Sequence, residues 1–173
     1  VMGSRVLLSL LREKGHEAKL LQINTRYTDL LTQKALDIIY EYVADSDVVG
    51  LSFNTFYALV AEQLARFLKN KGIKYIVIGG NHATALPGEV IEYSDIVIKY
   101  EAEITLPLVL EAIKEKQDFS KIKGIIYKYN GTVFHNEGAP DIVWELDILP
   151  FQSVDISLIK YFDLRNKLYT PKK

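Results

Sequence analysis

The hydrophobic residues of this chain follow two alternating patterns. Residues 47–53, 74–80 and 95–99 form short runs in which most side chains are apolar, which is typical of strands buried on both faces of a sheet. Between these runs, apolar residues recur every three or four positions, which is typical of amphipathic helices. Helices are expected at residues 4–14, 32–44, 57–71, a short stretch after Pro87, and 104–116. A further strand is expected at residues 18–23.

Alternating strands and helices of this kind predict an α/β fold. Apolar strands that are separated by helices form a parallel sheet, and the crossover helices cover both of its faces. We therefore expect a doubly wound, mostly parallel sheet of the flavodoxin-like or Rossmann-like kind.

The pattern changes after residue 120. Residues 125–129 and 132–136 flank Asn130-Gly131, which is a strong signal for a two-residue β-hairpin. Residues 137–173 have weak periodicity and three prolines, which predicts an extended tail. The expected organisation is an α/β domain at residues 1–120, a β-hairpin extension at 121–138 and a linker at 139–173.

The order of the elements also predicts that one strand is missing. The chain opens with a helix, whereas an open α/β domain normally opens with a strand, which is central in the flavodoxin-like order. Without that strand, residues 18–23 could lie beside residues 47–53 only across a gap or after a rearrangement. A gap would leave backbone groups unpaired. We therefore expect the natural protein to have a strand upstream of residue 1.

The composition of the chain limits the partners and the kinds of site that we expect. The 173 residues include 21 Lys and Arg and 22 Asp and Glu, so there is no electrostatic reason to expect nucleic acid or an anionic membrane as a partner. The absence of cysteine excludes disulfides, thiolate metal sites and iron–sulfur clusters within this chain. No apolar run approaches the roughly 20 residues that cross a bilayer. No signal peptide is visible either, and we expect a cytoplasmic location.

Ligands of open α/β sheets bind at the carboxyl ends of the strands. The segments expected there are residues 52–55 (SFNT), 79–84 (GGNHAT) and 100–103 (YEAE). Ser52, Asn54 and Thr55 offer small hydrogen-bonding groups that suit a phosphate, a ribose or a heterocycle nitrogen. Gly79 and Gly80 allow the backbone to turn sharply and to approach a ligand closely.

Each of these features has a structural alternative. Asn54 and Thr55 are common helix caps, and the two glycines could form a tight turn without a ligand. His82 could ligate a metal or donate to a ligand, or it could be a loop or helix-capping residue. Glu101 and Glu103 could form an acid–base pair, but carboxylates are also favoured in the first turn of a helix. The glycine spacing matches neither the dinucleotide fingerprint nor a P-loop.

Taken together, three segments resemble the cobalamin (B12)-binding domain that is fused to radical S-adenosylmethionine enzymes. They are DVVGLSFNT at 47–55, KYIVIGGNHATALPGEV at 74–90 and DIVIKYEAEITLPLVLEAI at 95–113. In that family a Gly-Gly precedes a His-Ala-Thr-like stretch and a Pro, and a later strand ends in Gly-Glu-Gly-Glu. Here Tyr100 and Ala102 replace the two glycines of the later motif. The likeness spans roughly residues 1–155, and LDILPF at 146–151 resembles the linker toward the radical domain.

The resemblance implies a cofactor and its contacts. Cobalamin would lie over the carboxyl edge of the sheet, with its nucleotide tail against Ser52, Thr55 and the two glycines. Related domains of methionine synthase and mutases carry a Ser-x-Leu and a Gly-Gly motif, which Ser52 and Gly79-Gly80 match. Gly3 lies where the glycine of their Asp-x-His-x-x-Gly motif would be, so a histidine ligand to cobalt would precede Val1. The cofactor-binding residues implied are Gly3, Ser52, Asn54, Thr55, Gly79, Gly80, Asn81, His82 and Glu101.

The resemblance also implies that these residues are one part of a larger enzyme. S-adenosylmethionine and a 4Fe–4S cluster would belong to a radical domain in the same polypeptide or in a partner, and the activity would be that of a methyltransferase or an oxidative cyclase. No catalytic side chain is assigned within residues 1–173. Two alternatives stay open: a stand-alone corrinoid carrier, and a flavodoxin-like ligand-binding or regulatory domain without cobalamin. A phosphoacceptor receiver is disfavoured because Ser52 and Gly79 stand where its acidic residues would be.

Overall fold

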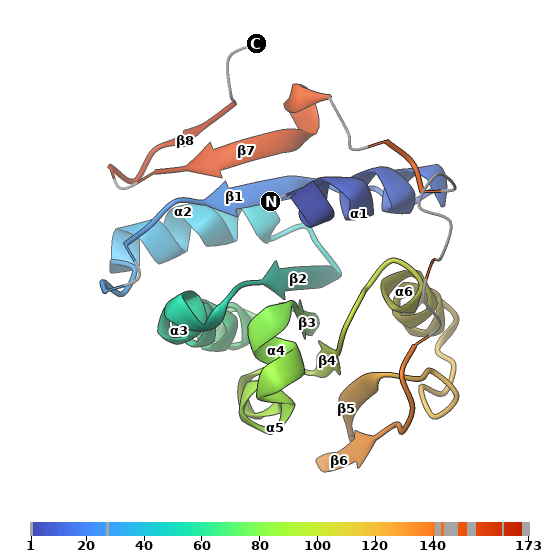
Figure 1. Ribbon diagram of the computed structural model, residues 1–173. Coiled ribbons are helices and arrows are strands. Elements are labelled where there is room, and N and C mark those ends of the chain that lie inside the picture. The colour runs from blue at the N-terminus through green and yellow to red at the C-terminus, as the bar shows by residue number, and fades with distance from the viewer. Residues whose placement is uncertain are drawn as a thin grey trace.

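The structure is a computed structural model that describes residues 2–26, 28–140, 143, 149–151, 155–163 and 165–170. Its α-helices are α1 (Met2–Glu13), α2 (Gln33–Val43), α3 (Ala58–Asn70), α4 (Asn81–Ala85), α5 (Pro87–Val90) and α6 (Thr105–Glu115), shown in Figure 1. Short 3₁₀ helices are η1 (Thr55–Tyr57), η2 (Ile91–Tyr93) and η4 (Ile156–Leu158). The strands are β1 (Leu20–Ile23), β2 (Val48–Ser52), β3 (Tyr75–Gly79), β4 (Ile96–Ile98), β5 (Ile125–Tyr129), β6 (Thr132–His135), β7 (Ile159–Phe162) and β8 (Leu168–Tyr169).

The main sheet has the order β2-β3-β4-β5-β6. β2, β3 and β4 run parallel, and successive crossovers through α3 and through α4 and α5 join them. The expected α/β fold with helices on both faces is therefore confirmed. The expected hairpin is also present, and it extends the main sheet because β5 pairs antiparallel with β4.

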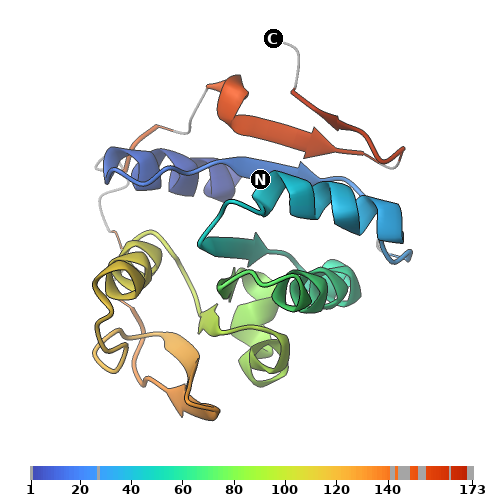
Figure 2. The ribbon, with the colours of Figure 1, turned by 180° about the vertical axis from the view of Figure 1, so that it is seen from behind.

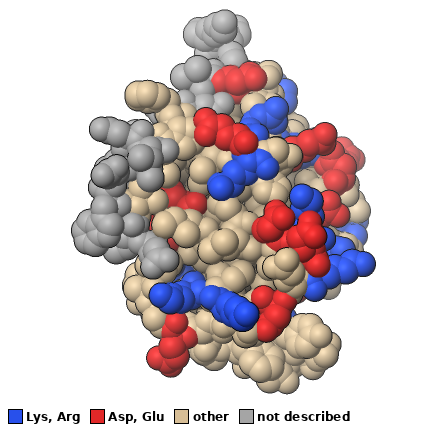
Figure 3. Space-filling view, turned by 90° about the vertical axis from the view of Figure 1, so that its right-hand side faces the viewer, with Lys and Arg blue, Asp and Glu red and all other residues tan. Residues whose placement is uncertain are grey.

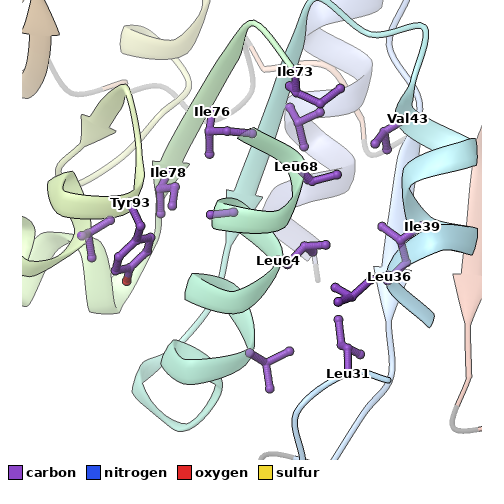
Figure 4. Packing of buried hydrophobic residues seen from close by; sticks show 14 of the residues in the cluster. Leu31, Leu36, Ile39, Val43, Leu64, Leu68, Ile73, Ile76, Ile78 and Tyr93 are labelled. Atoms are coloured by element: carbon purple, nitrogen blue, oxygen red, sulfur yellow. The ribbon is translucent and has the colours of Figure 1, made fainter. Parts of the chain in front are cut away.

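The core consists of two layers, one on each face of the main sheet. Ile76 and Ile78 of β3 point into the layer beneath α2 and α3, which Figure 4 shows from close by. The residue between them, Val77, points into the opposite layer together with Val109 of α6. This alternation explains why β3 and β4 are apolar at every position: both of their faces are covered.

The expectation that β2 is buried on both faces is wrong. Gly50 and Ser52 are exposed, Val48 and Leu51 are half-buried, and only Val49 is buried. The reason is that β2 forms an edge of its sheet and pairs with β3 alone. An apolar run thus identified a strand, but it did not show how completely the neighbouring elements cover that strand.

A second, smaller sheet has the order β1-β7-β8 (Figure 1; from behind in Figure 2). β7 runs parallel to β1, from the pair Leu20–Ile159 to the pair Ile23–Phe162. The structure thus has two strands, at residues 159–162 and 168–169, where an extended tail was expected. The almost complete burial of Ile159 and Phe162 stabilises this arrangement. The linker-like residues 146–148 lie outside the described residues, so the interpretation of residues 139–173 as a linker stays a prediction.

β1 and β2 do not pair with each other. Among the described residues, β1 is hydrogen-bonded only to β7 and β2 only to β3, so each strand has one edge without a partner in that part of the chain. In Figures 1 and 2, β1 lies between β7 and β2, which places its unpaired edge toward β2. The sheet is thus not continuous across this interval, as the order of elements along the sequence predicts.

Candidate functional site

The carboxyl ends of β2, β3 and β4 form one rim of the main sheet. The three strands are parallel neighbours, and the last residue of β2, Ser52, is in register with the last residue of β3, Gly79. The segments after these strands are therefore adjacent. The three segments expected to line a binding site are brought together on the same edge.

The turn after β2 lies directly against the glycine turn after β3. Gly80 has φ 99° and ψ −176°, a backbone conformation open essentially to glycine alone. A Cβ atom at this position would lie 2.9 Å from Ser52 Oγ and 3.1 Å from the backbone oxygen of Phe53. Gly80 is thus required both by its backbone conformation and by the close approach of the two turns.

A hydrogen bond joins the same two turns on their far side. Thr55, the first residue of η1, has its Oγ1 3.2 Å from His82 Nδ1. The ring of Phe53 packs against the imidazole, with ring centroids 5.5 Å apart. Together these contacts fix the turn at residues 52–55 relative to the short helix α4.

His82 lies beneath the rim and does not project from it. Only 2% of the residue is exposed, and its Nε2 is buried with no hydrogen-bond partner at hydrogen-bonding distance and geometry. The nearest acidic atom is Glu89 Oε1 at 3.5 Å from Nε2. A buried imidazole bonded to Thr55 suits a positioning residue for the 52–55 turn better than a direct contact with a large ligand.

The third segment of the rim is tied to the second by Thr84. The backbone N–H of Tyr100 donates to Thr84 Oγ1 at 2.8 Å, and the N–H of Thr84 donates to the carbonyl of Gly80 at 3.0 Å. Glu101 is exposed and Glu103 is half-buried, and both precede the first turn of α6. A continuous series of hydrogen bonds and close contacts therefore connects all three segments.

The structure also shows where the other predicted site residues, Asn54, Asn81 and Gly3, lie. Asn54 caps η1, because its Oδ1 accepts from the N–H of Phe56 at 3.1 Å. Asn81 is the exposed first residue of α4 and follows Gly80. Gly3 is exposed in the first turn of α1, and a Cβ atom there would meet nothing within 4 Å. Asn54 is therefore a helix cap, and this structural role is compatible with a contact to a ligand.

Large apolar side chains stand exposed on the segments that follow the strands. Their exposed fractions are Leu30 59%, Phe56 71%, Leu59 69%, Leu86 47% and Tyr100 54%. Leu30 follows β1, Phe56 and Leu59 follow β2, Leu86 follows β3, and Tyr100 follows β4. The sequence interpretation missed this set. Its only signal was that Leu59 lies outside the inward apolar stripe of α3.

The amino ends of the strands have fewer features of a ligand-binding site. A hollow of about 260 Å³ lies there, lined by polar residues that include Arg66, Lys69, Asp95 and Lys128. Lys69 and Asp95 already neutralise each other at 2.9 Å. Figure 3 shows acidic and basic side chains interspersed on that side of the molecule.

Among the described residues there is no group of three or more His, Asp or Glu side chains that could together hold a metal ion. In the same part of the chain, no helix is long and apolar enough to cross a membrane.

Known proteins share this fold and part of this sequence. The chain is 29% identical over 159 residues to an uncharacterised methyltransferase of Pyrococcus horikoshii, covering 90% of this chain and 33% of that protein. It superposes with a TM-score of 0.62 on the radical S-adenosylmethionine methyltransferase TsrM of Kitasatospora setae, solved with cobalamin and a 4Fe–4S cluster bound. That match has 22% identity and covers 82% of this chain and 26% of the TsrM chain.

A second solved structure gives the same picture. The cobalamin-dependent S-adenosylmethionine radical enzyme OxsB, with aqua-cobalamin and S-adenosylmethionine bound, matches with a TM-score of 0.59 and 18% identity, covering 82% of this chain and 25% of that one. At these identities the solved structures establish the shared fold. The chain spans about a third of the length of the curated relative it matches and about a quarter of these solved chains.

The family itself is shown by a family model. The model described as the B12 binding domain matches residues 1–110, which include the rim segments 52–55, 79–84 and 100–103. The cofactor expected from the sequence, cobalamin, is the one after which that family is named. The chain therefore belongs to the B12-binding domain family.

Proposed function

We propose that this domain holds cobalamin over the carboxyl rim of β2, β3 and β4. The observation that carries the proposal is the contact between the turn at residues 52–55 and the glycine turn at residues 79–80. Glycine is needed at residue 80 because a Cβ would collide with Ser52 and Phe53, and this close packing brings Ser52 and the backbone of the glycine turn to one point of the rim. Membership of the B12-binding domain family supports the same ligand.

The residues of the rim divide into two roles. The exposed hydroxyl of Ser52 and the backbone of Gly79, Gly80 and Asn81 would contact the nucleotide tail, whose phosphate and ribose need hydrogen-bond donors and acceptors. His82 would act from below and hold the neighbouring turn in place. When bound, cobalamin supplies methyl-transfer or electron-transfer chemistry at cobalt, and the protein orients it.

We propose further that the domain works as part of a radical S-adenosylmethionine enzyme of the methyltransferase or oxidative cyclase type. The methyltransferase of Pyrococcus horikoshii, TsrM and OxsB are all longer than this chain, which supports a further catalytic domain. The rim would then face that domain, because several large apolar side chains, Phe56, Leu59 and Tyr100 among them, stand exposed on the segments that follow the strands. A stand-alone corrinoid carrier is the alternative, and a three-cysteine cluster motif in the full-length gene would favour the enzyme.

Titration of the purified chain with hydroxocobalamin, followed by its visible spectrum and by equilibrium dialysis, tests the proposal. We expect saturable one-to-one binding that Ser52→Val weakens about tenfold, because two methyl groups take the place of the hydroxyl at the rim. Gly50→Ala is the matched control: it lies on the same strand two residues away, and its Cβ would meet nothing within 4 Å. It should bind like the parent chain.

Two results would contradict the proposal. One is the absence of saturable binding by the purified chain. The other is equal weakening by Ser52→Val and Gly50→Ala, since the effect would then come from β2 in general and not from the rim.

A further inference from the structure

Tyr100 has an unusual backbone for an aromatic residue. Four described residues other than glycine have positive φ: Tyr100 at 63°, Lys116 at 54°, Asn130 at 49° and Asn166 at 57°. Lys116 ends α6, and the two asparagines lie in the turns of the β5–β6 and β7–β8 hairpins, where a left-handed residue is common. Tyr100 ends no helix and closes no hairpin. It follows β4 at the rim.

Two hydrogen bonds hold Tyr100 in this conformation. Its own N–H donates to Thr84 Oγ1 at 2.8 Å, and the N–H of the preceding residue, Lys99, donates to the carbonyl of Gly124 at 2.9 Å. A left-handed backbone is unfavourable for a residue with a bulky side chain, because Cβ approaches the carbonyl oxygen. The surrounding structure therefore imposes the conformation on Tyr100.

The ring of Tyr100 contributes little to the stability of the fold. It is 54% exposed, and its one charged neighbour with an aromatic contact is Lys99, whose Nζ lies 5.9 Å from the ring centroid. An exposed cation–π contact of this length is weak. A strained residue with an exposed ring is unexplained by the stability of the chain, and such residues gather where ligands bind.

We propose that the Tyr100 ring packs against the corrin macrocycle of bound cobalamin and helps to set its position on the rim. The inference rests on the proposed function and deepens it. Thr84 ties Tyr100 to the glycine turn that would hold the nucleotide tail, so one ligand could reach both. The flat, largely apolar macrocycle would cover aromatic surface that otherwise faces water.

The test is to compare Tyr100→Gly with the parent chain. Glycine accepts a left-handed backbone without strain, so Tyr100→Gly should raise the Tm of the chain without ligand by about 3 °C. The same variant should bind hydroxocobalamin about tenfold more weakly, because the ring contact is lost. Tyr100→Phe keeps the ring, and its affinity should stay within about twofold of the parent value.

Lys116→Gly provides a matched control. It releases the same left-handed backbone strain at the end of α6, away from the rim, so it should raise Tm without changing affinity. If Tyr100→Gly binds hydroxocobalamin as tightly as the parent chain, the role of Tyr100 is refuted while the proposed function stands. If the parent chain does not bind hydroxocobalamin at all, both fail together.

Discussion

Gly80→Ala is the most direct perturbation of the rim. The substitution adds one methyl group at the point where the turn after β3 meets the turn after β2. The new Cβ would lie 2.9 Å from Ser52 Oγ and 3.1 Å from the backbone oxygen of Phe53. A side-chain hydroxyl can rotate away, but the carbonyl oxygen can move only if the turn moves with it.

The expected destabilisation has two parts. Backbone conformations that are essentially confined to glycine cost about 1–3 kcal/mol for other residues, and Gly80 has φ 99° and ψ −176°. Overlap with fixed neighbours adds about 1–3 kcal/mol, the usual range for added methyl groups in packed sites. The free energy of unfolding should therefore fall by about 2–6 kcal/mol, a large share of the 5–15 kcal/mol typical of a domain.

Gly72→Ala separates the two parts. Gly72 also has positive φ, at 95°, but an added Cβ there would meet nothing within 4 Å. Urea unfolding followed by circular dichroism should show a loss of about 1–2 kcal/mol for Gly72→Ala and a clearly larger loss for Gly80→Ala. Losses within about 0.5 kcal/mol of each other would refute the close contact between the turns.

A double variant provides a second test of the same contact. Ser52→Gly removes the hydroxyl that lies nearest to the added Cβ. Combined with Gly80→Ala, it should restore about 1 kcal/mol relative to the sum of the single effects, as expected for residues in contact.

Three further substitutions test other parts of the structure. His82→Ala removes a buried ring and its hydrogen bond to the turn after β2, and urea unfolding should show a loss of about 2–4 kcal/mol together with weaker hydroxocobalamin binding. Burial, and then nearby carboxylates, raise the pKa of Tyr93 from 10.0 to about 12. The unfolded chain therefore loses this proton first, and about 2 kcal/mol of stability should disappear between about pH 10 and pH 12 in the parent but not in Tyr93→Phe. Asp95→Ala deprives the buried N–H of Ile76 of its acceptor at 2.7 Å and should cost about 2 kcal/mol in chemical unfolding. Lys69→Ala removes a partly exposed ion pair and an exposed hydrogen bond to the carbonyl of Lys74, and it should cost about 1 kcal/mol or less.

The parts of the fold that depend on local periodicity could be predicted from the sequence. Residues 57–71 show an inward stripe at helical spacing, and α3 occupies Ala58–Asn70. The turn Asn130-Gly131 marks the β5–β6 hairpin because both residues accept positive φ. The rim segments were also placed correctly, since parallel strands bring their carboxyl ends to one edge.

The parts that depend on distant partners could not be predicted. β7 is a strand because Ile159 and Phe162 are buried when it pairs with β1, and nothing near residue 159 in the sequence carries that information. The burial of His82 has the same cause: it depends on Phe53 and Thr55, which belong to another turn. The short helix α4 was missed because it has only five residues and no apolar repeat.

The pairing of β1 with β7 has a consequence for how the chain acquires its structure. Leu20 lies near the start of the chain and its partner Ile159 near the end, so this ladder closes a very long loop. The main sheet, by contrast, is built from neighbours in sequence and can form while the later residues are still being synthesised. The edge of β1 that pairs with β7 therefore stays exposed until residues 159–162 have left the ribosome, and during that time it is open to aggregation.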